Sequence, residues 1–220
     1  WNYSVATDVV GRLVEVVSGM RLGDFLQKRI LGPLGMNDTS FYVAPDKQSR
    51  LAALYAFDPS PAKKVRYTAI ENQVVTQRSW DSGGGGLVST AADYWKFLQM
   101  LENGGELNGV RIISPTTLDL MTMNHIPGNK DISDWGRPMG EEVFYDGLGF
   151  GLGFAVVIDQ AKTKVACSNG TYSWGGMAST AFWIDPVEEI TAMFFTQLMP
   201  STTHPIRPFL RSLVYQSITE

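Results

Sequence analysis

The sequence changes character once, near Asp146, and this change limits the folds that the chain can adopt. Before it, apolar residues recur with helical spacing, and loops rich in Gly and Pro separate the periodic segments. After it come short runs rich in Gly, Phe and Val, divided by turn residues, which is typical of an antiparallel meander. This order predicts an α+β fold, with an antiparallel sheet flanked by helices and a mainly helical lobe. We expect the helical lobe with its loops over 1–145, and the sheet with a C-terminal helix over 146–220.

Periodicity, capping residues and breakers predict the individual elements. The first helix, over 5–17, is rich in β-branched valine, so we expect burial to hold it. Thr90 and Asp93 form a capping pattern at the start of a later helix. The other expected helices cover 22–31, 114–121 and 206–218. The expected strands cover 64–69, 148–158, 164–168, 179–184 and 190–198.

Composition removes several classes of function. The 220 residues are 44% apolar and 18% charged with a net charge of −4, which argues against disorder and against a nucleic-acid partner. No apolar stretch approaches the roughly 18 residues that a membrane span needs. The single cysteine, Cys167, excludes an internal disulfide and a Cys-rich zinc site, and two histidines are too few for the usual catalytic zinc site. We expect no cofactor and no metal.

Two further motifs suggest nucleophiles, and each is incomplete. Cys167 stands in an apolar run, so we expect a small core residue rather than a reactive thiol. Ser173 stands in a run that resembles G-x-S-x-G, but Thr171 replaces the first glycine and no strand-turn-helix context is expected. His125 and His204 are expected to be surface or capping residues rather than catalytic bases.

Two loop motifs also lack part of their pattern. Gly83–Gly86 (the glycine loop) is followed by Leu-Val-Ser instead of the Gly-Lys-Ser/Thr of a phosphate-binding loop, so we expect a flexible or tightly packed turn. The one S-x-x-K match, Ser60 to Lys63, is bracketed by prolines and followed by basic residues, so we expect a loop rather than a nucleophile helix.

The chain opens on Trp1-Asn2-Tyr3-Ser4, with no methionine and no signal peptide. A helical pattern follows at once, which is rare at a natural start. We therefore expect that an upstream segment is missing, and that a targeting signal could have been lost with it. The compartment, cytoplasmic or periplasmic, stays unassigned.

Landmarks in a fixed order resemble the serine β-lactamase and penicillin-binding-protein superfamily. They are Trp1 to Glu15, Pro33-Leu34-Gly35-Met36, Asp38-Thr39, Gly83 to Thr90, and Tyr172 to Gly176. More narrowly, the chain is similar to the family VIII carboxylesterases and related acyltransferases, which share the class C β-lactamase fold. The resemblance implies an S-x-x-K nucleophile upstream of Tyr3. It therefore makes the missing N-terminal segment a partner of this chain, which alone should be inactive.

The resemblance also implies roles for five residues. Tyr3 matches the tyrosine that works with the S-x-x-K lysine to take the proton of the nucleophile. Trp174-Gly175-Gly176 matches the K-T-G element on the strand beside the nucleophile, where two glycines allow close approach of a substrate. The amide of Met177 corresponds to the oxyanion donor of that strand.

Two departures from the family pattern favour an ester over a β-lactam. Val5 stands where β-lactamases of this fold carry Asn, and Trp174 replaces the lysine of K-T-G. Both changes make the cleft more apolar, as suits an uncharged ester. The resemblance thus implies a carboxylesterase that acts on small apolar esters through an acyl-serine. The alternatives are an acyltransferase, a β-lactamase or D,D-peptidase, and a non-catalytic ligand-binding fragment.

Overall fold

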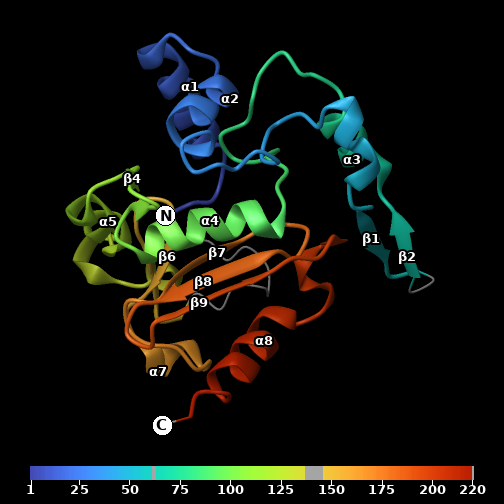
Figure 1. The fold of residues 1–220 in the computed structure, drawn as a ribbon. Helices are drawn as coiled ribbons and strands as arrows, with labels where there is room; N and C mark the ends of the chain where they lie inside the picture. The colour runs from blue at the N-terminus through green and yellow to red at the C-terminus, as the bar shows by residue number, and fades with distance from the viewer. Residues whose placement is uncertain (61–62, 137–145, 220) are drawn as a thin grey trace. The chain divides into compact units, whose positions relative to one another are not determined.

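A computed structural model of the chain describes residues 1–60, 63–136 and 146–219 (Figure 1). The chain forms two compact units, one of Tyr3–Ile112 and the other of Trp1–Asn2 with Ile113–Glu220. We call them the helical unit and the sheet unit. The units divide between Ile112 and Ile113, whereas the boundary expected from the sequence after residue 145 stays a prediction.

The helical unit contains most of the predicted helices and two short hairpins. Its helices are α1 (Ala6–Ser18), α2 (Leu22–Leu26), the π-helical η1 (Gln27–Leu31), the 3₁₀ helix η2 (Pro45–Arg50), α3 (Thr68–Val74) and α4 (Ala91–Glu102). Its antiparallel hairpins join β1 (Tyr55–Asp58) to β2 (Lys63–Arg66), and β3 (Glu106–Leu107) to β4 (Val110–Arg111). The predicted strand over 64–69 is therefore found in part, as β2.

The prediction that burial holds the first helix is wrong. Gly11 is its one buried residue among those described, while Val5, Val16 and Val17 are 64%, 64% and 86% exposed. Hydrogen bonds and close backbone contacts hold α1 instead. Gly19 takes a left-handed conformation after the helix and donates its amide to the carbonyl of Glu15 at 2.9 Å.

Helix α4 begins as the sequence predicts. The Thr90 side chain accepts a hydrogen bond from the Asp93 amide at 3.2 Å, which satisfies one of the free donors of the first turn. Within α4, Leu98 and Leu101 are buried. Helix α4 therefore has an apolar face in the core of the helical unit.

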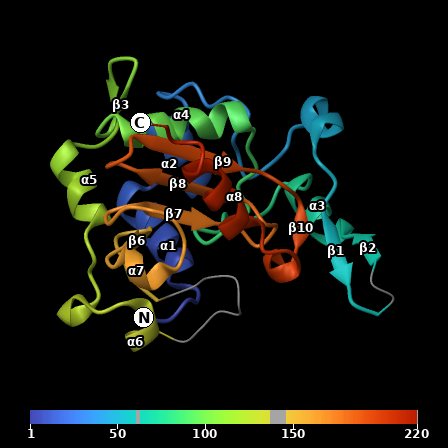
Figure 2. The same cartoon turned by 90° about the horizontal axis from the view of Figure 1, so that it is seen from below.

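The sheet unit is built on five antiparallel strands in the order β5-β6-β7-β8-β9 (Figure 2). They are β5 (Leu148–Phe150), β6 (Ala155–Val157), β7 (Tyr172–Gly175), β8 (Ala181–Asp185) and β9 (Ile190–Phe194). The smaller elements are α5 (Pro115–Thr122), η3 (Pro127–Asn129), α6 (Ile132–Trp135), α7 (Gln160–Thr163), β10 (Leu198–Met199) and η4 (Ser201–Thr203). The last helix, α8 (Ile206–Tyr215), lies along the sheet in both views, and the Arg211 guanidinium lies 5.3 Å from the centre of the Trp183 ring on β8.

Three of the predicted strands differ in the structure. The run over 148–158 is a hairpin of β5 and β6 rather than one strand, and the run over 190–198 contains β9 and β10. The strand predicted over 164–168 does not form. Lys164 instead ends α7 with a φ of 57°, in the left-handed region, and the next strand begins at Tyr172.

Candidate active site

Tyr3, the predicted general base, lies just before α1 in the helical unit and is 45% exposed. Val5, at the N-cap of α1, gives no side-chain cap. In the first turn, Asp8 accepts hydrogen bonds from the Ser82 hydroxyl and the Gly84 amide. These bonds, that of Ser82 foremost, hold the pKa of Asp8 below its ordinary value. The segment that carries Tyr3 is therefore fastened to the glycine loop through this turn.

The glycine loop packs directly on α1. A Cβ atom on Gly83 would lie 2.1 Å from the carbonyl oxygen of Thr7, which leaves no room for any side chain. Gly86 has a φ of +93°, a conformation that other residues rarely adopt. The loop is thus a tightly packed turn that supports the helix behind Tyr3.

An ion pair anchors the chain just before the glycine loop. The Nε and Nη2 atoms of Arg21 donate to the carboxylate of Asp81 at 2.8 and 2.7 Å, and the amide of Gly23 donates at 3.0 Å. Asp81 is buried, and its pKa is lowered chiefly by the hydrogen bonds from Arg21. This bidentate pair connects the loop to the start of α2.

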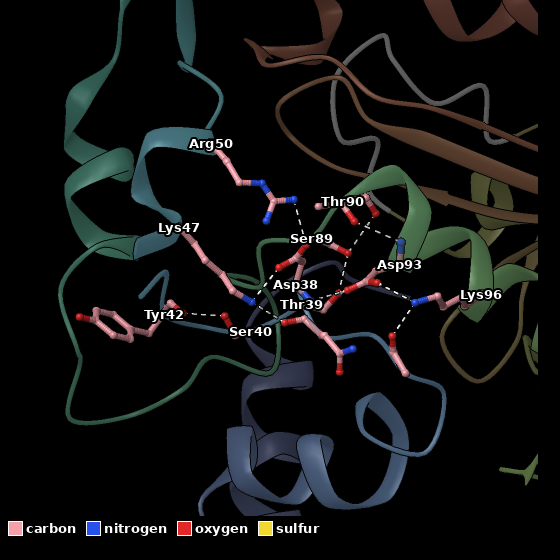
Figure 3. Close-up of polar contacts among 12 residues, drawn as sticks. Asp38, Thr39, Ser40, Tyr42, Lys47, Arg50, Ser89, Thr90, Asp93 and Lys96 are labelled. Atoms are coloured by element: carbon pink, nitrogen blue, oxygen red, sulfur yellow. Dashed lines mark hydrogen bonds and ion pairs between the residues drawn. The ribbon is translucent and has the colours of Figure 1, made fainter. Parts of the chain in front are cut away.

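A polar network explains why the Gly35 to Thr39 landmarks occur together (Figure 3). The buried carboxylate of Asp93 accepts hydrogen bonds from the Asp38 amide at 2.6 Å and from the Thr39 hydroxyl at 3.2 Å. Lys96 lies 3.1 Å from the same carboxylate and also donates to the carbonyl of Gly35. The network fixes this loop to α4, so we assign it to the framework of the helical unit.

The Asp38 side chain extends this network away from α4 (Figure 3). It pairs with Lys47 at 2.7 Å and with Arg50 at 2.9 Å, both on η2. Hydrogen bonds from Arg50, and next from Lys47, hold the pKa of Asp38 well below its usual range. The carboxylate is therefore paired with these two cations and stabilises the conformation of the loop.

Trp174, on the middle strand β7, lies within an aromatic row in the sheet unit. Its ring meets Phe150 edge-on at 5.5 Å and 75°, and Phe150 in turn lies 5.3 Å from the ring of Trp1. All three pack against the buried core cluster of Ile126, Ile132, Leu148, Ala155 and Val157. The indole that replaces a lysine of the family pattern therefore extends the apolar core toward the end of β7.

The two glycines after Trp174 are tightly enclosed by protein atoms. A Cβ on Gly175 would lie 2.6 Å from Cζ of Arg207, and a Cβ on Gly176 would lie 2.4 Å from Oγ1 of Thr180. Arg207 and Thr180 thus occupy the room that the glycines leave on this side. That the glycines also admit a substrate stays a prediction.

Met177 is the second residue after β7 and lies in the turn that follows the strand. It is 65% exposed, and among the described residues its amide has no hydrogen-bond acceptor. The preceding amide, that of Gly176, donates to the carbonyl of Thr180 at 3.0 Å. The turn after β7 therefore carries a backbone donor that is not used within the described structure.

The incomplete nucleophile motifs do not assemble a site. Ser173 lies inside β7, in register with Ala155 and Trp183, so it has no strand-to-helix turn around it. Cys167 is half-buried against the core cluster, with its sulfur 3.3 Å from the Thr163 hydroxyl. Cys167 therefore has a role in packing, and Ser173 is an ordinary strand residue.

The two histidines do not form a site either. His125 is exposed and its Nε2 lies 2.8 Å from the carbonyl of Leu120, and His204 is exposed at the end of η4. In the S-x-x-K match, Pro61 and Ala62 lie outside the described residues. Within the described parts of the chain, no three metal-ligating side chains gather, and no helix has the length and apolar character to cross a membrane.

The predicted site residues thus lie in two groups. Tyr3 belongs to the helical unit, whereas Trp174 to Met177 lie at the end of β7 and in the turn after it, in the sheet unit. Sequence reasoning missed Arg207 and Asp81, because their partners are distant along the chain. The arginine in the first turn of the last helix was the one available signal for Arg207, since cations are usually disfavoured there.

Known proteins are similar to this chain in sequence. The sequence matches the Beta-lactamase family over residues 1–216. An uncharacterized protein of Mycobacterium tuberculosis is 37% identical over 203 residues, which are 90% of this chain and 49% of that protein. Lovastatin esterase of Penicillium rubens is 30% identical over 197 residues, which are 84% of this chain and 47% of the esterase.

A solved structure shows the same architecture. EstCE1, described as a hydrolase with promiscuous acyltransferase activity, superposes with a TM-score of 0.80 and 25% identity over 97% of this chain and 55% of its own. The chain spans about half the length of these relatives. Its fold is the α+β fold of the β-lactamase and transpeptidase type, as predicted. On the family match and this shared architecture, the chain belongs to the Beta-lactamase family.

Proposed function

We propose that the protein is a serine hydrolase that cleaves small, uncharged carboxylic esters through an acyl-enzyme. The observation that carries the proposal lies at the end of β7, where the apolar Trp174 stands three residues before the exposed Met177, whose amide has no acceptor among the described residues. An apolar wall beside an unused amide donor suits an ester whose carbonyl oxygen becomes negative during attack. The similarity to lovastatin esterase and to the hydrolase EstCE1 supports ester chemistry.

In the proposed reaction, a serine from outside residues 1–220 attacks the ester carbonyl and its proton passes to Tyr3. The lysine of the same S-x-x-K motif stabilises the phenolate of Tyr3 before this step. The oxyanion accepts hydrogen bonds from the Met177 amide and from the amide of the serine itself. The bond to the alcohol then breaks, and Tyr3 returns its proton to the leaving oxygen. Water repeats the attack with Tyr3 as base, which releases the acid and the free serine.

The side chains that would attract a β-lactam are replaced by apolar ones. Val5 has no amide to bind the side chain of a β-lactam, and Trp174 has no charge for its carboxylate. Removal of an attractive charge lowers the affinity for an anion but leaves the affinity for a neutral ester intact. We therefore expect the full-length protein to hydrolyse p-nitrophenyl butyrate much faster than nitrocefin.

The test is Tyr3→Phe in the full-length protein. Because general acid–base groups contribute about 10²–10⁴-fold, we expect kcat for p-nitrophenyl butyrate to fall by at least about 100-fold. KM should change little, since the phenol acts on the proton of the nucleophile rather than on the bound ester.

Tyr67→Phe is the matched control, because Tyr67 lies in the same unit with a similar exposure of 41%. Its kcat should equal that of the unmodified protein. A Tyr3→Phe protein that kept near-normal kcat would show that another group is the base. If the full-length protein hydrolysed no neutral ester, the esterase proposal would fail and the non-catalytic ligand-binding alternative would be favoured.

Acyl transfer is the second candidate, favoured by the acyltransferase activity named for EstCE1. The same acyl-serine would then react with an alcohol in place of water. Products formed with an added alcohol distinguish the two reactions. An ester product that exceeds the free acid would identify a transferase.

A further inference from the structure

The carbonyl group next to the Met177 amide is bound by a half-buried cation, Arg207. Nη2 of Arg207 donates to the carbonyl oxygen of Gly176 at 2.7 Å and to that of Thr180 at 2.9 Å. Thr180 also accepts the amide of Gly176 at 3.0 Å. One guanidinium nitrogen therefore ties together both sides of the turn that follows β7.

This contact sets the direction of the Met177 amide together with the Ser179 amide, which donates to the same carbonyl at 3.1 Å. The carbonyl of Gly176 and the N–H of Met177 belong to one planar peptide unit, and in the trans form they point in opposite directions. Holding the oxygen between Arg207 and the Ser179 amide therefore fixes where the N–H points, which is away from the guanidinium. A cation on one side of the peptide leaves the other side open for an acceptor.

The contact also strengthens the donor. Hydrogen bonds from a guanidinium are charge-assisted and roughly twice as strong as neutral ones. A hydrogen bond to the carbonyl of a peptide polarises its N–H, by roughly 10–30% in condensed phases. The Met177 amide is thus both oriented and made a better donor to a negative oxygen.

The local sequence makes room for this arrangement. A Cβ at position 175 would collide with Cζ of Arg207 at 2.6 Å, so glycine is required for the guanidinium to reach the strand. Arg207 itself lies in the first turn of α8, where the helix dipole disfavours a cation. Its two carbonyl contacts offset this unfavourable position.

We infer that Arg207 is a positioning residue for the oxyanion donor, because it orients and polarises the Gly176–Met177 peptide. The inference rests on the proposed esterase function for its catalytic consequence. Arg207 does not touch the ester and acts only through the Met177 amide. Its loss should therefore weaken the transition state and spare substrate binding.

The experiment compares Arg207→Met, Arg207→Lys and Arg211→Met in the full-length protein. Loss of one oxyanion donor costs about 10²–10³-fold in kcat, and a misplaced donor should cost part of this. We expect Arg207→Met to lower kcat for p-nitrophenyl butyrate about 10- to 100-fold, with KM within about threefold. Arg207→Lys should recover part of the loss, because an ammonium still carries charge but lacks the planar fork.

Arg211→Met is the matched control, because Arg211 lies on the same helix and contacts the Trp183 ring instead of β7 backbone. It tests whether loosening α8 is enough to reduce kcat. A second readout is the inhibition constant of phenylboronic acid, whose serine adduct is a tetrahedral anion. The constant should rise in Arg207→Met by the same factor as kcat/KM falls. Equal losses of kcat in both Met variants, or an unchanged boronic acid constant, would overturn the inference.

A readout independent of activity separates this inference from the esterase proposal. In ¹⁵N-methionine-labelled protein, with the signal assigned through Met177→Leu, the Met177 amide resonance should move in Arg207→Met and stay in Arg211→Met. An unmoved signal would overturn the inference even in an active esterase. If the signal moves in a protein that is inactive on esters, the inference that Arg207 orients the Gly176–Met177 peptide is supported, and only the esterase proposal fails.

Discussion

Asp185 is completely enclosed in the sheet unit, with 0% of its surface exposed. Its carboxylate accepts hydrogen bonds from the amides of Ser168 at 3.0 Å and Val187 at 3.0 Å, and from the Tyr215 hydroxyl of α8. Burial alone would raise the pKa of Asp185, but the bonds from Tyr215 and from neighbouring amides outweigh it and lower the pKa. One residue thus joins β8 to the last helix.

Tyr215→Phe should weaken this connection in a way that depends on pH. Loss of a hydrogen bond to a charged group should lower the free energy of unfolding by about 2 kcal/mol at neutral pH. A carboxylate with a lowered pKa contributes stability above its unfolded pKa of about 4, and loses it as pH falls through the folded pKa. The variant brings the pKa of Asp185 nearer its ordinary value, so stability should differ less between pH 7 and pH 3. Urea unfolding at both pH values measures this, with Tyr67→Phe as control.

At the residue scale, sequence predicts contacts between neighbours and misses contacts between distant residues. The cap of α4 was predictable because Thr90 and Asp93 are three residues apart. The bond of Arg207 to Gly176 joins residues 31 apart, and that of Arg21 to Asp81 joins residues 60 apart. Such pairs depend on the folded arrangement, which no local pattern encodes.

At the scale of elements, α1 shows where hydrophobic periodicity misleads. Its apolar spacing was correct for a helix but wrong for burial, since Val9 and Leu13 are each 56% exposed. The contacts that hold it are polar ones at Asp8 and Glu15, together with the close approach of Gly11 to Gly83. The strand expected over 164–168 does not form, because a left-handed Lys164 directs the chain into a turn.

Two identical substitutions in different helices test this view of α1. Leu13→Ala, at an exposed position, should lower the free energy of unfolding of the 220-residue chain by less than about 1 kcal/mol. Leu98→Ala in α4 removes a side chain with 0% exposure and should cost about 3–5 kcal/mol. Chemical denaturation compares them. A loss for Leu13→Ala as large as that for Leu98→Ala would show that α1 buries its apolar face.

At the scale of the whole molecule, the sequence predicted the order of helices before sheet, and the structure confirms it. Periodicity carried that prediction because a helical repeat and a strand repeat differ clearly over ten or more residues. It could not divide the run over 148–158 into β5 and β6, since three-residue strands give almost no repeat. Periodicity also could not predict that Tyr3 and β7 belong to separate units.

Charge and exposed apolar surface together predict how the 220-residue chain behaves in solution. The sequence pI is about 5.2, and the net charge of −4 at pH 7 vanishes near that pH. Apolar side chains exposed on α1 and α8 then meet no electrostatic repulsion between molecules. We expect light scattering to show a sharp maximum of self-association near pH 5. Lysines introduced at Val16 and Val17 should reduce it, and equal scattering at pH 5 and pH 8 would contradict this prediction.

The aromatic row of Trp1, Phe150 and Trp174 has a practical consequence. Indole emission responds to the polarity and quenching groups around the ring, and Trp174 is only three residues before Met177 in the chain. The protein thus carries its own optical probe beside the candidate site. Ligands without any chromophore can be titrated against it, and Trp174→Phe identifies the part of the signal that comes from this ring.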